Sequence, residues 1–465
     1  MPLLDRLPRH LFSPRGWGLL AAGVLSLVSA QIMGRRDLLS LSVLLIVLPL
    51  VSLAGIRLVK PRFKVYREFS PSPVETSATT TVRLAVARAG FGGGRAVMAE
   101  RLPPRFGESP AFRYPARSAR GGTSRYEYHM RSTKRGQYLI GPVTAEFTDP
   151  FGLSLHRRAI DDGDTLTVTP AAVELPVTGL AGARGNDGIT TTRTRANPSD
   201  DDVMTREYRP GDPMRRVHWA ATAHHSALMV RQEESVTTPE ATIILDQRFA
   251  AFSGGHGSGF GAHAAADGHE MITSGTFEWA VVAAISICTH LSERNYVLRL
   301  LDARGEPAFL RSPSALEPEA EEFTGAAGLA SIAESLAAIH LSGHHPAARE
   351  HGDDGPAVFD DHLMDKLSAH RMRGPIIAVL GRIPPAEARA LAPGAGYGAN
   401  AFAIIVSDRP DDSEDSLEAL RQSGWRAIAV PASSPVAEAW SRFDQGSAAP
   451  DTAAADVRRG AGVRR

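Results

Sequence analysis

Two long apolar runs, separated by a short charged loop, open the chain. Residues 16–33 contain no charged side chain, and residues 38–56 form a second run that only Pro49 interrupts. Each run has about the 20 residues that a helix needs to cross the hydrocarbon core of a bilayer. A secretory signal peptide is an alternative for the first run alone. Because the second run follows after so short a loop, we predict a transmembrane helical hairpin over residues 16–57.

The region over residues 63–175 alternates between apolar and polar side chains. This period of two is typical of half-buried strands, and glycines and prolines separate the alternating segments. The clearest segments are residues 79–88, 124–131, 136–142 and 165–169. Several short strands separated by turns predict a small β-sandwich. Within this region we expect residues 149–153, Asp-Pro-Phe-Gly-Leu, to form a turn that buries Phe151 and Leu153.

Beyond residue 239 the pattern changes to uniformly apolar strands that alternate with segments of helical periodicity. The predicted strands are residues 241–246, 296–301, 375–380, 402–406 and 425–430, and the predicted helices are residues 277–291, 329–341, 359–367 and 413–423. Strands that are apolar on both faces imply a parallel sheet with helices packed on each side. We therefore predict a doubly wound α/β domain over residues 240–435, followed by a disordered tail at residues 446–465.

A connection at residues 176–239 joins these two domains, and a Gly/Ala/His-rich insert interrupts the second one. The insert spans residues 253–275, directly after the first strand of the α/β domain. Its histidines lack the spacing of metal ligands on a helix. We interpret the insert as a solvated loop whose role stays open.

The charges balance overall but are unevenly distributed. Lys and Arg number 51, as do Asp and Glu, so the formal net charge is zero, which argues against nucleic acid as the main partner. Three arginines within residues 6–15 precede the predicted hairpin and five basic side chains within residues 57–67 follow it, whereas the loop holds Arg35 and Arg36. By the positive-inside rule, both ends of the hairpin and the domains that follow are cytoplasmic. We predict a multi-pass protein of the plasma membrane.

The single cysteine, Cys288, limits the chemistry. It excludes an intramolecular disulfide and any cysteine-based zinc site. It lies in an apolar stretch, where a buried thiol is expected rather than a nucleophile. A cysteine-poor chain also agrees with a reducing compartment.

The densest cluster of directional side chains lies in the connection, at residues 206–219. It contains four arginines against the two acids Glu207 and Asp212, which leaves a local net charge of +2. A Pro-Gly turn precedes Asp212, which can cap a short helix, and we expect Trp219 to be buried with an arginine stacked on it. The cluster either docks an anionic partner, or its arginines pair with acids of the two flanking domains and fix their orientation.

His218 close to Asp212 suggests acid–base chemistry. No nucleophile motif accompanies this pair, because the chain lacks Gly-x-Ser-x-Gly, a Walker loop and His-Glu-x-x-His. We therefore predict that the protein is not an enzyme. The alternative is a hydrolase that uses the cluster at residues 206–219.

The cluster and the residues after it resemble the hallmark of a bacterial membrane-protein family catalogued as domain of unknown function 58. The positions that carry the resemblance are Arg206, Glu207, Tyr208, Pro210, Gly211, Asp212, Arg215, Trp219, Ala223, Leu228 and Glu234. The layout of hairpin, β-domain, cluster and α/β domain is similar too, over residues 16–430. The sequence departs from the family pattern at Pro213, His218 and His224, where an acid, an Asp and an Arg are usual. Our candidate binding or interdomain residues are Arg206, Glu207, Tyr208, Gly211, Asp212, Arg215, Trp219 and Glu234.

The resemblance implies that the α/β domain is similar to a von Willebrand factor A domain. Such domains often bind a divalent cation through Asp-x-Ser-x-Ser after the first strand, with a Thr and an Asp from later loops, because the ion needs hard oxygen ligands. The corresponding positions here are Asp246, Arg248 and Ala250, and the later strand ends in Gly381 and an arginine without an acid. We therefore predict no metal and no other cofactor. We expect Asp246 to pair with Arg248 or to cap the next helix.

The resemblance also implies a partner. Members of the family are generally found beside MoxR-type AAA+ ATPases and are thought to act as their membrane-linked partners. We therefore predict a membrane-anchored, non-enzymatic protein that partners such an ATPase in protein assembly, maturation or envelope functions. A metal-dependent adhesion module that uses Asp246 is a further alternative, which would need an extracellular domain.

Overall fold

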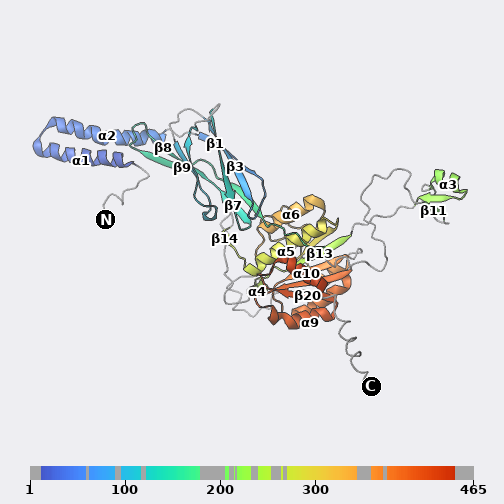
Figure 1. Cartoon of the computed structure of the whole chain (residues 1–465). Helices are drawn as coiled ribbons and strands as arrows, with labels where there is room; N and C mark the ends of the chain where they lie inside the picture. Colours follow the sequence, from blue (N-terminus) through green and yellow to red (C-terminus); the bar gives the residue numbers. More distant parts are fainter. Residues whose placement is uncertain are drawn as a thin grey trace, which may run out of the picture.

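The computed structural model shows an amino-terminal helix pair, small antiparallel sheets and a carboxyl-terminal α/β domain (Figure 1). The residues that the structure describes are 12–58, 62–89, 96–116, 122–177, 205–208, 214, 217–231, 239–252, 263–264, 270–342, 358–369 and 374–445. The predicted tail at residues 446–465 lies outside them. Most of the insert at residues 253–275 and much of the connection at residues 176–239 lie outside them as well.

Two helices, α1 (Pro14–Met33) and α2 (Arg36–Leu58), pack against each other as a hairpin (Figure 1). Ser13 caps α1, because its side-chain oxygen accepts a hydrogen bond from the backbone N–H of Gly16. By length and composition both helices are able to cross a bilayer. Many of their large apolar side chains face outward, as in Leu25, which is 69% exposed. An outward apolar surface is expected where lipid is the solvent.

Short sheets follow the hairpin and form a β-domain. The strands are β1 (Arg62–Ser70), β2 (Val74–Glu75), β3 (Thr79–Ala89), β4 (Ala96–Glu100), β5 (Ala111–Tyr114), β6 (Thr123–Arg131), β7 (Gly136–Ile140), β8 (Val143–Thr148), β9 (Leu155–Ala159) and β10 (Asp164–Thr169). They form sheets of order β1-β3-β6, β2-β10-β7 and β5-β4-β8-β9, in which β2 alone pairs in parallel. In β3 the buried side chains are Val82, Leu84 and Val86. Their spacing of two is the alternation that the sequence predicted.

A buried ion cluster around Arg67 ties the three sheets of the β-domain together. The guanidinium of Arg67, in β1, pairs with Glu100 of β4 and lies 2.5 Å from the carboxylate of Asp164 in β10. It also lies 2.8 Å from Asp161, and the hydroxyl of Tyr128 donates to Glu100. Burial opposes the charge, but Glu100 and Asp161 outweigh it and raise the pKa of Arg67 above its usual value.

The α/β domain is a six-stranded sheet in the order β17-β16-β13-β18-β19-β20. Its strands are β13 (Glu240–Leu245), β16 (Val297–Leu301), β17 (Glu322–Phe323), β18 (Pro375–Leu380), β19 (Asn400–Val406) and β20 (Trp425–Val430). All of these strands are parallel except β17, which is antiparallel at one edge. The helices of the domain are α4 (Phe249–Phe252), α5 (Gly275–Ser292), α6 (Gly325–Ala337), α7 (Asp361–Ser368), α8 (Pro385–Leu391), α9 (Glu414–Gln422) and α10 (Val436–Gln445). This architecture confirms the predicted α/β fold class.

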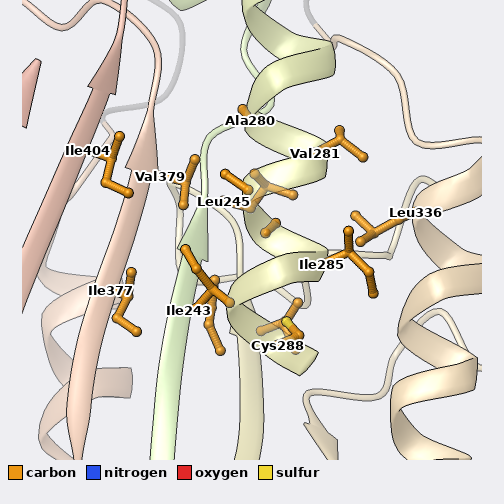
Figure 2. Close-up of a cluster of buried hydrophobic side chains, with 14 of the residues drawn as sticks. Ile243, Leu245, Ala280, Val281, Ile285, Cys288, Leu336, Ile377, Val379 and Ile404 are labelled. Atoms are coloured by element: carbon orange, nitrogen blue, oxygen red, sulfur yellow. The ribbon is translucent and has the colours of Figure 1, made fainter. Parts of the chain in front are cut away.

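Helices cover both faces of the sheet. Ile243 of β13 belongs to a buried cluster with side chains of α5, α6 and α10, whereas the neighbouring Ile244 belongs to a cluster with α7, α8 and α9. Figure 2 shows the first face, where Ile243 and Ile377 of the sheet lie on one side of α5 and Ile285 of α5 lies beside Leu336 of α6 on the other. Burial of each such side chain stabilises the fold by roughly 1.5–3 kcal/mol. Burial on both faces explains why most positions of these strands are apolar.

Arg135 joins the β-domain to the α/β domain. It lies between β6 and β7, is 2% exposed, and donates through Nη1 to the backbone carbonyls of Leu336 (2.6 Å), Ala337 (3.2 Å) and Ile339 (2.8 Å). Its Nε and Nη2 each lie 3.0 Å from a carboxylate oxygen of Glu278 in α5. Leu336 and Ala337 are the last residues of α6, where the helix dipole favours a cation, and Ile339 follows the helix. Arg135 therefore contributes a buried contact between the two domains, beside the hydrogen bond from the backbone N–H of Val173 to the Ser286 hydroxyl of α5 (2.9 Å).

Candidate functional site

The candidate site lies at the carboxyl edge of the six-stranded sheet, between β13 and β18. The chain leaves β13 toward β16 on one side of the sheet and leaves β18 toward β19 on the other. In open α/β sheets ligands bind at such a switch point, beyond the carboxyl ends of the strands. Asp246 directly follows β13, and Gly381 directly follows β18.

Asp246 is fully buried and uses both carboxylate oxygens for Arg248. Its Oδ1 accepts hydrogen bonds from the backbone N–H (3.0 Å) and from Nε (2.9 Å) of Arg248, and its Oδ2 accepts one from Nη2 (2.8 Å). Its own backbone N–H donates to the carbonyl of Val379 in β18 (3.0 Å). The prediction that Asp246 pairs with Arg248 is confirmed. The two parallel hydrogen bonds form a bidentate pair, which fixes orientation as well as charge.

Arg248 also bridges to the first turn of α8. Its Nη1 lies 2.9 Å from Oε2 of Glu387, and its guanidinium carbon lies 5.3 Å from the centre of the Phe359 ring. Burial opposes the charge of Arg248, but Asp246 and Glu387 raise its pKa above the usual value. The guanidinium therefore keeps a permanent positive charge at the switch point.

These residues do not fit a divalent cation. Such an ion needs several free oxygen ligands, but both oxygens of Asp246 are engaged by Arg248 and Ala250 has no side-chain oxygen. The fixed charge of Arg248 also repels a cation. Among the described residues, no group of three or more His, Cys, Asp or Glu side chains is arranged to hold a metal ion.

The protein itself fills the space between the two strand ends. The short helix α4 lies there, and the backbone N–H of Arg382 donates to the carbonyl of Ala251 in that helix (2.8 Å). A Cβ atom added at Gly381 would lie 2.5 Å from the same carbonyl oxygen, so only glycine permits this approach. The switch point is therefore packed, and what it offers to other molecules is its outer rim.

The rim of the carboxyl edge is charged and exposed. The side chain of Arg382 is 53% exposed, and its Nη2 lies 3.7 Å from Oδ2 of Asp412, which is 43% exposed. Asp408, Arg409 and Asp411 follow β19 and are exposed beside them. Exposed charges of both signs at one edge suit recognition of a charged protein surface, because complementary charges steer association and select partners.

The sequence cluster forms a separate small unit with its own two-stranded sheet. Strand β11 (Thr205–Glu207) pairs antiparallel with β12 (Met229–Arg231), which places Arg206 opposite Val230 and Glu207 opposite Met229. The backbone N–H of Tyr208 donates to the carbonyl of Leu228 (2.8 Å). The backbones of Arg206, Glu207 and Tyr208 therefore form one side of this two-stranded unit.

Helix α3 (Trp219–His225) closes this unit. Its amino end is capped by His218, whose Nδ1 accepts a hydrogen bond from the backbone N–H of Ala221 (3.1 Å). The expectation that Trp219 is buried is wrong, because the indole occupies the first helical position and is 65% exposed. One of the two ring nitrogens of His218, Nδ1, is thus engaged in capping α3.

Four candidate residues of the cluster, Gly211, Asp212, Arg215 and Glu234, lie outside the described residues. The cap expected at Asp212 lies outside them too. The structure therefore brings Arg206, Glu207, Tyr208 and Trp219 into one unit and leaves the other four unplaced. Asp246 lies in a different element, at the sheet edge.

Two titratable side chains of α5, Cys288 and His290, are buried in the core. Burial raises the pKa of the Cys288 thiol to about 12, so it does not form a nucleophilic thiolate near neutral pH. Burial and the neighbouring Arg294 lower the pKa of His290 to about 4. The expectation of a buried thiol at Cys288 is confirmed.

The sequence did not predict the contacts of Arg135 and Glu387, nor the groups that form hydrogen bonds with Asp149. Arg135 is one basic residue of a turn between two strands, and nothing in its neighbours distinguishes it from a solvated one. Glu387 faces Arg248 across 139 positions of sequence, so no local spacing links them.

No family model matches this chain, and no curated protein matches it at a significant level.

Proposed function

We propose that this protein is a membrane-anchored, non-enzymatic docking protein. Its hairpin holds it in the plasma membrane, and the charged rim at the carboxyl edge of its α/β sheet binds a partner protein. The observation that carries the proposal is the locked switch point, where Arg248 engages both oxygens of Asp246 and pairs with Glu387. A site whose ionisable groups satisfy one another has no free base or nucleophile to offer.

The exposed side chains around the Asp246–Arg248–Glu387 group recognise the partner. Arg382, Asp412 and Arg409 project from the loops after β18 and β19, at the edge where α/β domains present their binding residues. The packed centre gives these loops a rigid base. A rigid rim lowers the conformational cost of binding.

The partner that we propose is a MoxR-type AAA+ ATPase. This choice rests on the resemblance of the 206–234 cluster and of the domain layout to the family of domain of unknown function 58. The basic residues on both sides of the hairpin favour a cytoplasmic α/β domain, which is the orientation that this proposal needs. A periplasm-dependent reporter fused after residue 445 is expected to be inactive; activity would overturn this orientation.

Co-purification tests the docking role. The full-length protein, tagged and extracted in mild detergent, is expected to retain the ATPase encoded beside it in at least one of three states: nucleotide-free, with ADP, or with a non-hydrolysable ATP analogue. Arg382→Glu is expected to weaken retention, because it reverses a charge of the rim. The control is Arg442→Glu, an exposed arginine near the end of α10 that also pairs with one surface acid. Failure to associate in all three states would contradict the proposal.

A further inference from the structure

The turn at residues 149–154 is built around a buried carboxylate. Asp149 is 7% exposed, and its Oδ1 accepts hydrogen bonds from the backbone N–H groups of Leu153 and Ser154, 2.7 Å each. Its Oδ2 accepts from the backbone N–H of Phe151 (3.1 Å) and from the hydroxyl of Ser52 in α2. The last of these bonds ties the turn to one helix of the hairpin.

The other helix of the hairpin holds the same turn. The backbone N–H of Ser13, the cap of α1, donates to the carbonyl of Leu153 (2.9 Å), and its hydroxyl donates to the carbonyl of Gly152 (2.6 Å). A Cβ atom added at Gly16 would lie 2.1 Å from the carbonyl oxygen of Leu153, so the backbones touch. The turn is therefore locked onto both helices where α1 begins.

Helix length sets the height of this turn relative to a bilayer. The stretch of α1 from Gly16 to Met33 and that of α2 from Ser52 back to Arg36 each rise about 25 Å, at about 1.5 Å per residue. The hydrocarbon core of a bilayer is about 30 Å thick. If the hairpin spans the core, the turn lies at the near boundary of the hydrocarbon, level with the headgroups.

Phe151 is the exposed tip of the turn. The expectation that the turn buries both Phe151 and Leu153 is half wrong: Leu153 is 4% exposed, but Phe151 is 64% exposed. The four hydrogen bonds to Asp149 fix the backbone so that this ring points away from the protein. Exposed aromatic rings held at this height are typical of membrane interfaces.

Basic side chains surround the turn. Arg15 lies in the first turn of α1 and Arg57 in the last turn of α2, and both are exposed. Strand β9, which contacts α2, adds His156 and Arg157. Burial, then the charges of Arg158 and Arg57, lower the pKa of His156. One acid, Glu146, stands opposite Arg157 in the neighbouring strand. The surroundings of the turn are basic overall, which favours anionic headgroups.

We propose that the turn at residues 149–154 is a second membrane contact of this protein. The Phe151 side chain enters the headgroup boundary of the bilayer that α1 and α2 cross, and Arg15, Arg57 and Arg157 bind anionic lipid headgroups. This inference rests on the proposed membrane anchoring by the hairpin. Its consequence is that the β-domain holds a fixed tilt on the membrane surface.

Site-specific fluorescence in reconstituted protein tests the inference. The wild type carries one buried cysteine, Cys288, so a cysteine introduced by Phe151→Cys in the full-length chain is the one that takes an NBD label. The protein is placed in phosphatidylcholine vesicles, with and without phosphatidylglycerol, that contain spin-labelled lipid. Matched labels are introduced by Leu25→Cys in α1 and Leu316→Cys in the α/β domain, at positions 69% and 74% exposed.

The label at position 151 is expected to be blue-shifted and quenched by lipid spin labels near the headgroups, whereas the label at position 316 is not. Phosphatidylglycerol is expected to strengthen the quenching. If position 25 is quenched but position 151 behaves like position 316, the inference is overturned while the anchoring stands. If position 25 is not quenched either, the anchoring fails and the inference fails with it. Equal quenching at position 151 with and without phosphatidylglycerol would overturn the headgroup-binding role of the arginines.

Discussion

Arg248 holds the carboxyl edge of this α/β sheet in one state. Its guanidinium lies within hydrogen-bonding distance of both oxygens of Asp246 and forms an ion pair with Glu387. A cation supplied by the chain itself cannot dissociate. The edge is therefore always in one state, unlike an edge whose shape depends on a bound ion.

Magnesium binding and the stability of an Arg248 variant test this account together. Titration calorimetry of the full-length protein with magnesium is expected to give no binding heat. Arg248→Ala is expected to lower the free energy of unfolding by about 3 kcal/mol, because it leaves the Asp246 carboxylate buried without its partner. Arg382→Ala, at an exposed arginine nearby, is expected to change it by about 0.5 kcal/mol or less. Magnesium binding that disappears in Asp246→Ala would refute the locked edge.

Asp149 makes the attachment of the hairpin dependent on pH. Burial opposes its charge, but hydrogen bonds from Ser52, Ser154 and Leu153 outweigh burial and hold the pKa of the carboxyl below its ordinary value. Because the folded-state pKa is the lower one, the stabilisation is complete above the unfolded-state pKa of about 3.9 and is lost as pH falls through the folded-state pKa.

The variant Asp149→Asn is therefore expected to be less stable than the wild type by about 1–2 kcal/mol at pH 7. The difference is expected to shrink below about pH 4, where the carboxyl of the unfolded wild-type chain takes up its proton and the folded carboxyl follows at lower pH. Denaturant unfolding in detergent at a series of pH values measures both quantities. A difference that is constant across this range would show that the carboxylate charge plays no part.

Predictions for single residues were partly right and partly wrong. The Asp246–Arg248 pair was predictable because the two residues are two positions apart on the same loop, and a buried acid needs a partner. The exposure of Trp219 and Phe151 was not, because hydrophobicity alone assigns an aromatic ring to the interior. Their positions depend on hydrogen bonds of the neighbouring backbone, which no periodicity records.

At the scale of elements, the parallel strands were the most predictable part of the fold. The runs at residues 375–380 and 402–406 coincide closely with β18 (Pro375–Leu380) and β19 (Asn400–Val406), because strands buried on both faces are apolar throughout. Helix α10 (Val436–Gln445) was missed, although its Trp440 is 2% exposed. Its apolar stripe is short and lies next to the tail, so composition hides it.

The contact between the β6–β7 turn and the ends of α5 and α6 gives a testable coupling between domains. Arg135→Ala removes three hydrogen bonds to helix carbonyls and the pair with Glu278. Amide hydrogen exchange is expected to rise at the carboxyl end of α6 and at the β6–β7 turn, because both lose their buried partner. Arg131→Ala, at an exposed arginine of the same hairpin, is the control. Equal exchange in the two variants would mean that Arg135 does not hold the domains together.

At the scale of the whole molecule, buried charged residues connect the hairpin, the β-domain and the α/β domain in series. The hairpin is fixed to the β-domain through Asp149, the β-domain to the α/β domain through Arg135, and the sheet edge is locked by Arg248. Each connection uses a buried charged side chain, and its distant partners (Ser52 for Asp149, Leu336 for Arg135 and Glu387 for Arg248) were beyond the reach of local sequence patterns. Such an arrangement suits a scaffold that presents one rim at a fixed distance from the membrane.

The most direct test of this account is the affinity of the full-length protein for the neighbouring ATPase, measured in the nucleotide state that binds best. The account predicts that Arg382→Glu weakens binding at least about tenfold, the equivalent of about 1.4 kcal/mol, and that Arg442→Glu leaves it unchanged. Equal affinity for wild type and Arg382→Glu would place the docking surface elsewhere, and no binding in any nucleotide state would contradict the central claim.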